Sequence, residues 1–207
     1  MDSSVESLRV IADAMRAFTE ATTDYRQLLD LVVERVATLV HHHCAIRLVS
    51  SDREHLELVA HYDVDPHART LGERAMGATR LRIDGPHLTT RVMKSSAAFL
   101  VRDVDLDQLR GEVMPEIWAA MLELEVKSLL YVPLKVHREL IGVLSVARRG
   151  RDAATLEDRD VELVQTVADG AALAISNARL FAEARRQHTE RRRAEDSLRM
   201  VEDARRF

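Results

Sequence analysis

The residue types that most often do chemistry are sparse in this chain and do not form a catalytic pattern. The single cysteine, Cys44, stands in an apolar stretch with Ile46 and Leu48, where a buried and inert thiol is expected. One cysteine allows no disulfide within the chain and no CxxC redox or metal pair. There is also no glycine-rich phosphate loop, phospho-accepting histidine box or kinase ATP signature. We therefore expect no catalysis from this chain.

Histidines are the next candidates, as metal or haem ligands. Adjacent residues of a strand point to opposite faces, so at most two of His41, His42 and His43 could meet one metal. We expect this triplet to be a solvated junction between a helix and a strand, and we predict no metal site. Haem would need an axial ligand such as His61 or His87. Because His87 follows Pro86 at a predicted helix start, where an imidazole faces solvent, haem is not favoured.

A non-covalent ligand site is the better candidate. If Cys44 and Ile46 face packing helices, Arg47 faces the other side of its strand. An arginine in an apolar strand must reach solvent, pair with an acid or meet an anionic ligand. Apolar pockets with a few polar groups are typical ligand sites, although ordinary core packing remains an alternative for the apolar members. The candidate ligand-binding residues are Arg47, Met93, Met114, Trp118, Met121 and Tyr131.

The elements that must position these residues are read from hydrophobic patterning. Residues 128–149 predict two strands around the break His137-Arg138-Glu139, with Pro133 indicating a bulge or an edge and Gly142 a bulge or a close approach. Residues 63–79 look irregular or briefly helical. Further strands are predicted at 43–49, 55–61, 80–83 and 98–104, and helices at 25–40, 87–95, 112–125 and 156–206.

Both ends of the chain predict helices with narrow apolar seams. Near the start, the seam comprises Leu8, Ile11, Met15 and Phe18. The last helix should begin with a capping box of Thr155 and Asp158. Seven-residue spacing follows at Leu173, Leu180, Gln187, Ala194 and Val201, with partners Asn177, Ala184, Arg191, Leu198 and Arg205. We predict a homodimer through the N- and C-terminal helices. A solvated helix is the open alternative.

Composition narrows the remaining classes. A net charge of −4 and a pI of about 6.1 give no general attraction to nucleic acid. The first residues lack a basic region and an apolar core, and no run of about 18 apolar residues exists. We expect a cytoplasmic protein with no membrane insertion. The helical pattern continues to the last residues, so we expect a fragment of a longer protein.

Four motifs in order give this sequence a family resemblance. They are S-x-L-x-V-P-L at residues 128–134, I-G-V-L at 141–144, N-A-R-L at 177–180, and the strand 100–104 with its aspartate turn. Together they resemble a GAF domain of a bacterial signalling protein. The resemblance implies an α+β fold of the GAF/PAS-like type, with a central antiparallel sheet, helices on one face and a pocket on the other. It divides the chain into an N-terminal dimerisation helix (1–23), a GAF sensor domain (24–181) and a coiled-coil signalling linker (182–207). The hairpin break at 137–139 departs from the family, which usually has a glycine-containing turn there.

The resemblance also limits the ligands. Enzymes of this fold that reduce free methionine sulfoxide use several cysteines, and bilin-binding members carry a cysteine in the later helical part, where this chain has none. The N-K-F-D-E motif of phosphodiesterase-type domains is absent as well. The cofactor is unknown. Residues 190–207 resemble linkers that lead to a PAS or histidine-kinase segment. We expect the sensory input module of a sensor histidine kinase that binds an unidentified small molecule; the alternative is a ligand-free module for dimerisation and spacing.

Overall fold

The computed structural model describes residues 11–18, 24–77, 79–150 and 152–204, with side chains described as far as Arg192. Six strands form one sheet in the order β3-β2-β1-β6-β5-β4, and every neighbouring pair is antiparallel. The strands are β1 (His43–Val49), β2 (His55–Asp63), β3 (Arg80–Arg82), β4 (Phe99–Val101), β5 (Val126–Val136) and β6 (Glu139–Arg149). The β5–β6 hairpin predicted from the sequence thus lies inside the sheet, between β1 and β4.

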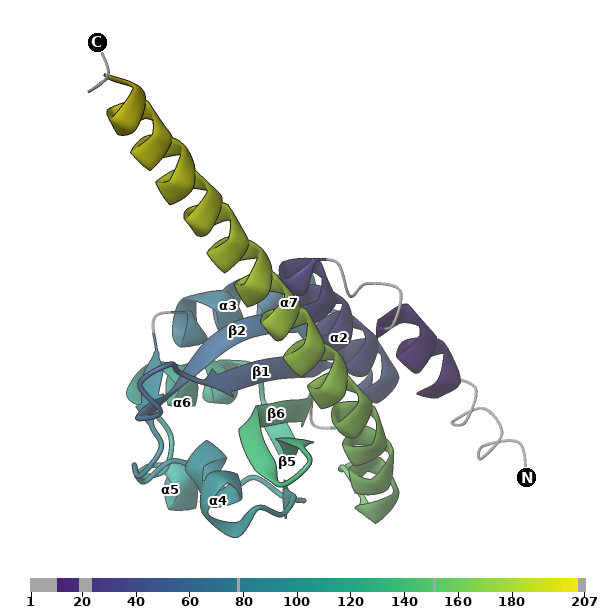
Figure 1. The fold of residues 1–207 in the computed structure, drawn as a ribbon. Coiled ribbons are helices and arrows are strands. Elements are labelled where there is room, and N and C mark those ends of the chain that lie inside the picture. Colours follow the sequence, from purple (N-terminus) through teal and green to yellow (C-terminus); the bar gives the residue numbers. More distant parts are fainter. Residues whose placement is uncertain (1–10, 19–23, 78, 151, 205–207) are drawn as a thin grey trace.

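Helices cover both faces of this sheet. They are α2 (Tyr25–Val40), α3 (Pro66–Met76), α4 (Leu88–Ser95), α5 (Leu106–Leu109), α6 (Pro115–Glu123) and α7 (Asp158–Ala204), and residues 11–18 are helical too. In Figure 1, α2 and α7 lie side by side, and α7 continues well past the sheet. The shorter helices α3, α4 and α6 lie against the other face. The α+β class predicted from the sequence is confirmed.

Alternation along β1 divides the interior into two layers. Cys44, Ile46 and Leu48 point into the largest core, which α2, α7 and residues 11–18 complete. On the opposite face, Val49 packs with Leu56 beneath the shorter helices. The strand is buried on both sides because helices cover both faces of the sheet.

The hairpin confirms what its proline and glycine indicated. Strand β4 pairs with β5 only between Leu129 and Tyr131, so Pro133 lies past the end of that pairing, at an edge position. Gly142 marks a close approach: a Cβ placed there would be 2.3 Å from the carbonyl oxygen of Arg47. The turn itself is tight, and His137 adopts a φ of 57° where glycine is the favoured residue.

Several segments differ from the sequence-based expectations, three of them clearly. Residues 66–76 form a regular helix, because Asp65 caps α3 through its carboxylate and Pro66 occupies the first turn. The strand expected at 98–104 shortens to Phe99–Val101. The last helix begins at Asp158 instead of just after Thr155, and the Asp160 carboxylate accepts the backbone N–H of Glu157 at 2.7 Å.

Two predictions fall partly outside the described residues. Only residues 11–18 of the N-terminal helix are described, and the seam residues beyond Arg192 have no described side chains. Among the helices that are described, none combines the length and the hydropathy needed to cross a bilayer.

Candidate functional site

A cavity of about 100 Å³ lies between the sheet and the helices α3 and α6. Most of its wall is apolar, with polar groups from four strands. The lining residues are His43, Asp63, Ala68, Gly72, Ala75, Met76, Ile117, Ala120, Met121, Leu124, Val126, Leu129, Tyr131, Ser145, Val146, Ala147 and Arg149. Ligand sites for drug-sized molecules measure roughly 300–1,000 Å³, so this cavity suits a molecule of only a few heavy atoms.

Strand register brings distant residues to this one face. Paired residues in an antiparallel sheet point to the same side. The pairing His43 to Asp63 and His43 to Ala147 forms one row across β2, β1 and β6. A second row joins Ala45 to Ser145 and Ser145 to Tyr131. The floor of the cavity is therefore assembled from two pairs of consecutive strands, β1 with β2 and β5 with β6, and the two pairs are far apart in sequence.

The roof is open because its helices present small residues at helical spacing. On α3, Ala68, Gly72 and Ala75 are buried and face the cavity. The residues that face the cavity from α6 are Ile117, Ala120 and Met121, followed by Leu124 at the C-cap, at steps of three, one and three that are typical of one helix face. Short side chains on α3 keep the two layers apart without filling the space between them.

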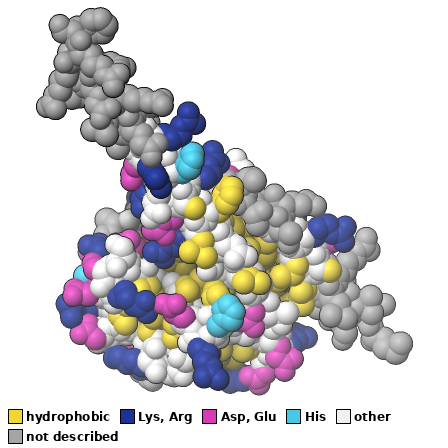
Figure 2. Space-filling model, in the orientation of Figure 1, with side chains coloured by type: hydrophobic (Ala, Val, Ile, Leu, Met, Phe, Trp, Pro, Cys, Tyr) yellow, Lys and Arg dark blue, Asp and Glu magenta, His cyan; other side chains and the backbone are white. Residues whose placement is uncertain are grey.

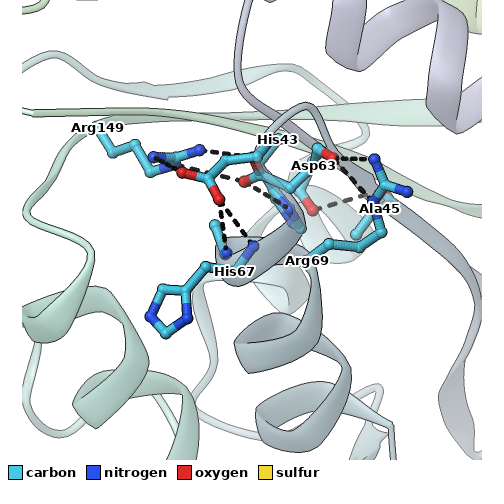
Figure 3. A network of polar contacts seen from close by, with 9 residues as sticks. His43, Ala45, Asp63, His67, Arg69 and Arg149 are labelled. Carbon is cyan, nitrogen blue, oxygen red and sulfur yellow. Dashed lines mark hydrogen bonds and ion pairs between the residues drawn. The ribbon is translucent and has the colours of Figure 1, made fainter.

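The polar end of the cavity is an ion pair between Asp63 and Arg149 (Figure 3). Arg149 Nη2 lies 2.6 Å from Asp63 Oδ1, and the Asp63 side chain is only 1% exposed. The same carboxylate oxygen accepts the backbone N–H of Asp65 at 2.9 Å. Arg69 donates to the backbone carbonyl of Asp63 through Nε and Nη2. The buried carboxylate is therefore both neutralised and fixed in orientation.

His43 stands beside this ion pair as a neutral imidazole. Its Nδ1 lies 3.9 Å from Asp63 Oδ2, and its ring centre is 6.2 Å from that of His61. Burial lowers the pKa of His43 to about 4, although Asp63 opposes the shift. At neutral pH one ring nitrogen can donate and the other can accept. The expectation of a solvated junction is wrong for His43, whose side chain is 18% exposed.

The structure distributes the six predicted ligand-binding residues over different surroundings. Met121 and Tyr131 line the main cavity. Met114 and Tyr131 line a smaller one of about 40 Å³, and Met93 packs nearby with Val143. Trp118 points away from the main cavity, because its indole N–H donates to the Leu106 carbonyl at 3.1 Å. Their role in binding stays a prediction.

Arg47, the sixth predicted residue, lies on the cavity face of the sheet and is 6% exposed. The sequence predicts that this guanidinium reaches solvent, pairs with an acid or meets an anionic ligand. The structure shows neither of the first two, because both hydrogen bonds of Arg47 go to Thr79. Its Nη1 donates to the Thr79 carbonyl at 2.9 Å and its Nη2 to the Thr79 hydroxyl at 2.6 Å. Burial lowers the pKa of the guanidinium to about 10, so it remains charged at neutral pH.

Sequence reasoning missed the polar end of the cavity. Asp63 and Arg149 both stand at strand ends, where a charged residue reads as solvent-facing. One signal was present: His43 and Arg47 are four residues apart in one strand and therefore share a face. The partners on β2 and β6 could be found only through the register.

Strand β6, which ends at Arg149, also contacts the first turn of α7. Arg148 faces the opposite side of the sheet, where its Nη2 lies 2.9 Å from Asp160 Oδ1. It also donates to the carbonyls of Val40 and Thr155. Two adjacent residues of β6 therefore form ion pairs on opposite faces of the sheet: Arg149 at the cavity and Arg148 at the first turn of α7.

Within the described residues, no group of three or more His, Cys, Asp or Glu side chains is placed to hold a metal ion. The site as built can bind a small molecule through shape, hydrogen bonds and the imidazole of His43. Its polar end carries no unbalanced charge, because Arg149 offsets Asp63.

Comparisons with solved structures place this fold among known proteins. The GAF domain of a phosphoenolpyruvate-protein phosphotransferase from Acinetobacter is 18% identical with a TM-score of 0.66, covering 84% of this chain and 94% of that chain. Residues 122 to 287 of a methyl-accepting chemotaxis protein are 22% identical with a TM-score of 0.61, covering 81% and 98%. Free methionine-R-sulfoxide reductase from Neisseria meningitidis, in complex with its substrate, is 15% identical with a TM-score of 0.64, covering 87% and 94%.

At these identities the solved structures show a shared fold only. None of the curated protein sequences that were compared matches this chain. The family model of the GAF domain matches residues 22–176, which include the whole sheet, all the cavity-lining residues and the first part of α7. The chain therefore belongs to the GAF domain family.

Proposed function

We propose that this chain is a sensory module that binds a small molecule in the cavity and relays its presence through α7. The observation that carries the proposal is the composition of the cavity. Apolar residues of α3 and α6 roof it, while a buried imidazole and a buried ion pair stand at one end. A pocket with apolar walls and a few fixed polar groups is what ligand recognition requires.

The relay would run along β6. A ligand that contacts Arg149 or Asp63 acts on the end of a strand whose next residue, Arg148, holds Asp160 in the first turn of α7. Both members of the second ion pair are mostly buried, at 14% and 10% exposure, so they cannot shift independently of the helix. Ligand binding would bias α7 between two packings by its differential affinity for them.

The signal relayed to α7 would act on a homodimer, in which α7 and the N-terminal helix form the interface. Leu173 and Leu180 lie seven residues apart on α7 and are 51% and 62% exposed, so the helix presents apolar side chains at coiled-coil spacing to solvent. Figure 2 shows hydrophobic side chains gathered on the face of the molecule that carries α2 and α7. A second copy packed along this seam would cover them.

The setting we propose is the input part of a cytoplasmic sensor histidine kinase, with a PAS or kinase segment downstream and no catalysis in this chain. Its support is the coiled-coil spacing of α7 and the likeness of the fold to that of a methyl-accepting chemotaxis protein. A ligand-free spacer is the competing function, and the small volume of the cavity is the observation that favours it.

Blocking the cavity decides between these two functions. Ala120 is buried in the cavity wall, whereas its neighbour Ala119 on α6 is exposed. A120L should abolish the rise in melting temperature that small molecules give the wild type in a thermal-shift screen, and A119L should preserve it. If no compound stabilises the wild type, or if A120L responds as the wild type does, the cavity is not a ligand site and the spacer function is favoured.

A relay would also change the dimer seam. Cysteines introduced at Leu173 and Leu180 are exposed and can report on it, while the native Cys44 is buried and will not react. Disulfide crosslinking at the two positions should change in opposite directions when a stabilising compound is added. Equal crosslinking with and without that compound contradicts the relay.

A further inference from the structure

The ion pair at the polar end of the main cavity offers no unpaired charge to a ligand. Arg149 contacts two carboxylates, because its Nη2 lies 2.6 Å from Asp63 Oδ1 and its Nη1 lies 3.7 Å from Asp65 Oδ2. The second oxygen of Asp63 accepts from Arg149 Nε at 3.4 Å. The two charged residues that line the cavity therefore balance each other. An ionic ligand would bring an uncompensated charge into a largely apolar space, which costs free energy.

His43 lines the same cavity and has unused hydrogen-bonding capacity (Figure 3). Its Nδ1 lies 3.9 Å from Asp63 Oδ2, beyond hydrogen-bond distance. Within the described part of the chain, neither ring nitrogen has a hydrogen-bond partner. The Ser145 hydroxyl, by contrast, donates to the Ala45 carbonyl at 3.5 Å. Tyr131 is the other lining residue whose polar group has no such partner, but it also lines the smaller cavity, whereas His43 lines the main one alone.

The imidazole of His43 offers a ligand one acceptor. Burial lowers its pKa to about 4, so the ring carries a single N–H at neutral pH. The Asp63 carboxylate on the Nδ1 side favours that proton on Nδ1. Nε2 is then left as an acceptor, and the group that matches it is a neutral O–H or N–H donor. Such a donor needs no counter-ion.

The size of the cavity limits the body of the ligand. The cavity holds about 100 Å³, whereas an apolar cavity of about 150 Å³ is enough for benzene. A molecule of about four to five heavy atoms therefore fits. The residues around its body would be apolar, among them Ala120, Met121 and Leu129. An alkyl body gains free energy by leaving water for such walls.

We propose that the main cavity binds a small neutral molecule with an alkyl body and one hydrogen-bond donor, such as a short-chain alcohol, whose donor meets Nε2 of His43. This inference rests on the proposed sensory function and specifies the chemical class of the ligand. Shape and the apolar walls would supply most of the affinity, and His43 would select for the donor. Ions of the same size would be rejected by the cost of burying their charge.

Compounds of nearly equal size separate charge from hydrogen bonding. The probes are n-butanol, methyl propyl ether, n-butylammonium and propionate. Binding is measured by titration of ¹³C-methyl-methionine-labelled protein, because Met121 and Met76 both line the cavity. Butanol should bind the wild type about fivefold more tightly than the ether, which has the same composition but no donor. It should bind about tenfold more tightly than either ion.

Substitutions assign the donor contact to His43. H43F keeps a ring and removes both nitrogens, so butanol and the ether should bind it equally. H43Q keeps a neutral hydrogen-bonding side chain and should retain part of the preference for butanol. Y131F, which removes the hydroxyl of the other unpartnered lining residue, should retain all of it. A120L should abolish binding of both compounds by filling the cavity, whereas A119L, at an exposed position of α6, should not.

Different results contradict the inference and the proposed function. Equal binding of butanol and the ether to the wild type, binding of either ion as tight as that of butanol, or an undiminished preference in H43F would overturn the inference and leave the cavity as a ligand site. The inference alone also fails if none of the four probes binds while another compound stabilises the wild type. If none binds and no other compound stabilises the wild type, the inference fails together with the proposed function.

Discussion

His43 should make the folded protein sensitive to mild acid. In the folded state its pKa is about 4, because burial disfavours the imidazolium. In the unfolded chain the pKa returns to about 6.5. The unfolded state therefore binds more protons between these values, and the free energy of unfolding falls as the pH drops from about 6.5 towards 4. Above pH 6.5 the stabilisation is fully present.

The size of the effect follows from the two pKa values. The shift lowers the free energy of unfolding by about 2 kcal/mol between pH 7.5 and pH 5. Groups facing His43 are the carboxylate of Asp63 at 3.9 Å, the ring of His61 and the Arg149 guanidinium. Burial also lowers the pKa values of His42 and His61, so they add to the acid sensitivity of the wild type. A substitution of His43 isolates the contribution of this residue to the acid-induced loss of stability.

The assay is urea denaturation of the wild type and H43Q at pH 7.5 and pH 5, followed by circular dichroism. Glutamine keeps a neutral hydrogen-bonding side chain and cannot be protonated. H43Q should lose about 2 kcal/mol less than the wild type between the two pH values. H188Q, at an exposed position of α7, should follow the wild type. If H43Q and the wild type lose equal free energy, His43 is not held as a neutral buried group and the description of the polar end is wrong.

Two further substitutions probe the sheet and its ion pair. G142A places a methyl group 2.3 Å from the Arg47 carbonyl oxygen, so it should lower the free energy of unfolding by about 3 kcal/mol. The control G111A, whose methyl group meets nothing within 4 Å, should change the free energy of unfolding little. Similar values for both variants in chemical denaturation would contradict the close approach at Gly142. D63N removes the nearest and buried counter-ion of Arg149 and should cost about 3–5 kcal/mol. D65N removes only the more exposed and more distant carboxylate, 3.7 Å from Arg149, keeps an α3 cap, and should cost less than about 1 kcal/mol. An equal loss in the two asparagine variants would show that burial of Asp63 does not matter.

Much of the fold could be predicted because its signals are local. The burial of Cys44 and Ile46 towards the helices follows from a period of two, and the hairpin shows itself through clustered β-branched residues around a polar turn. Residues 63–79 were expected to be irregular or briefly helical, although Asp65 and Pro66 are a good helix start. Gly72 is a buried residue of the resulting helix α3 and lines the cavity.

The site was harder to predict because its members meet only through strand pairing. His43 begins β1, Asp63 ends β2 and Arg149 ends β6. When the pairing is counted from the β1–β2 loop, a register shift between Arg47 and Ile46 changes which β2 residue stands opposite His43. Nothing local to any of these segments encodes the shift, so the buried ion pair could not be inferred from the sequence.

In the proposed relay, ligand in the cavity is coupled to α7, and methionine methyl signals report on both places. Met121 and Met76 line the cavity, whereas Met15 packs directly on Gly170 of α7. Titration of ¹³C-methyl-methionine-labelled protein with a compound that stabilises it should shift all three signals with one common affinity. Shifts at Met15 without shifts at Met121 and Met76, or cavity shifts that leave Met15 unchanged at saturation, would contradict the coupling between the cavity and α7.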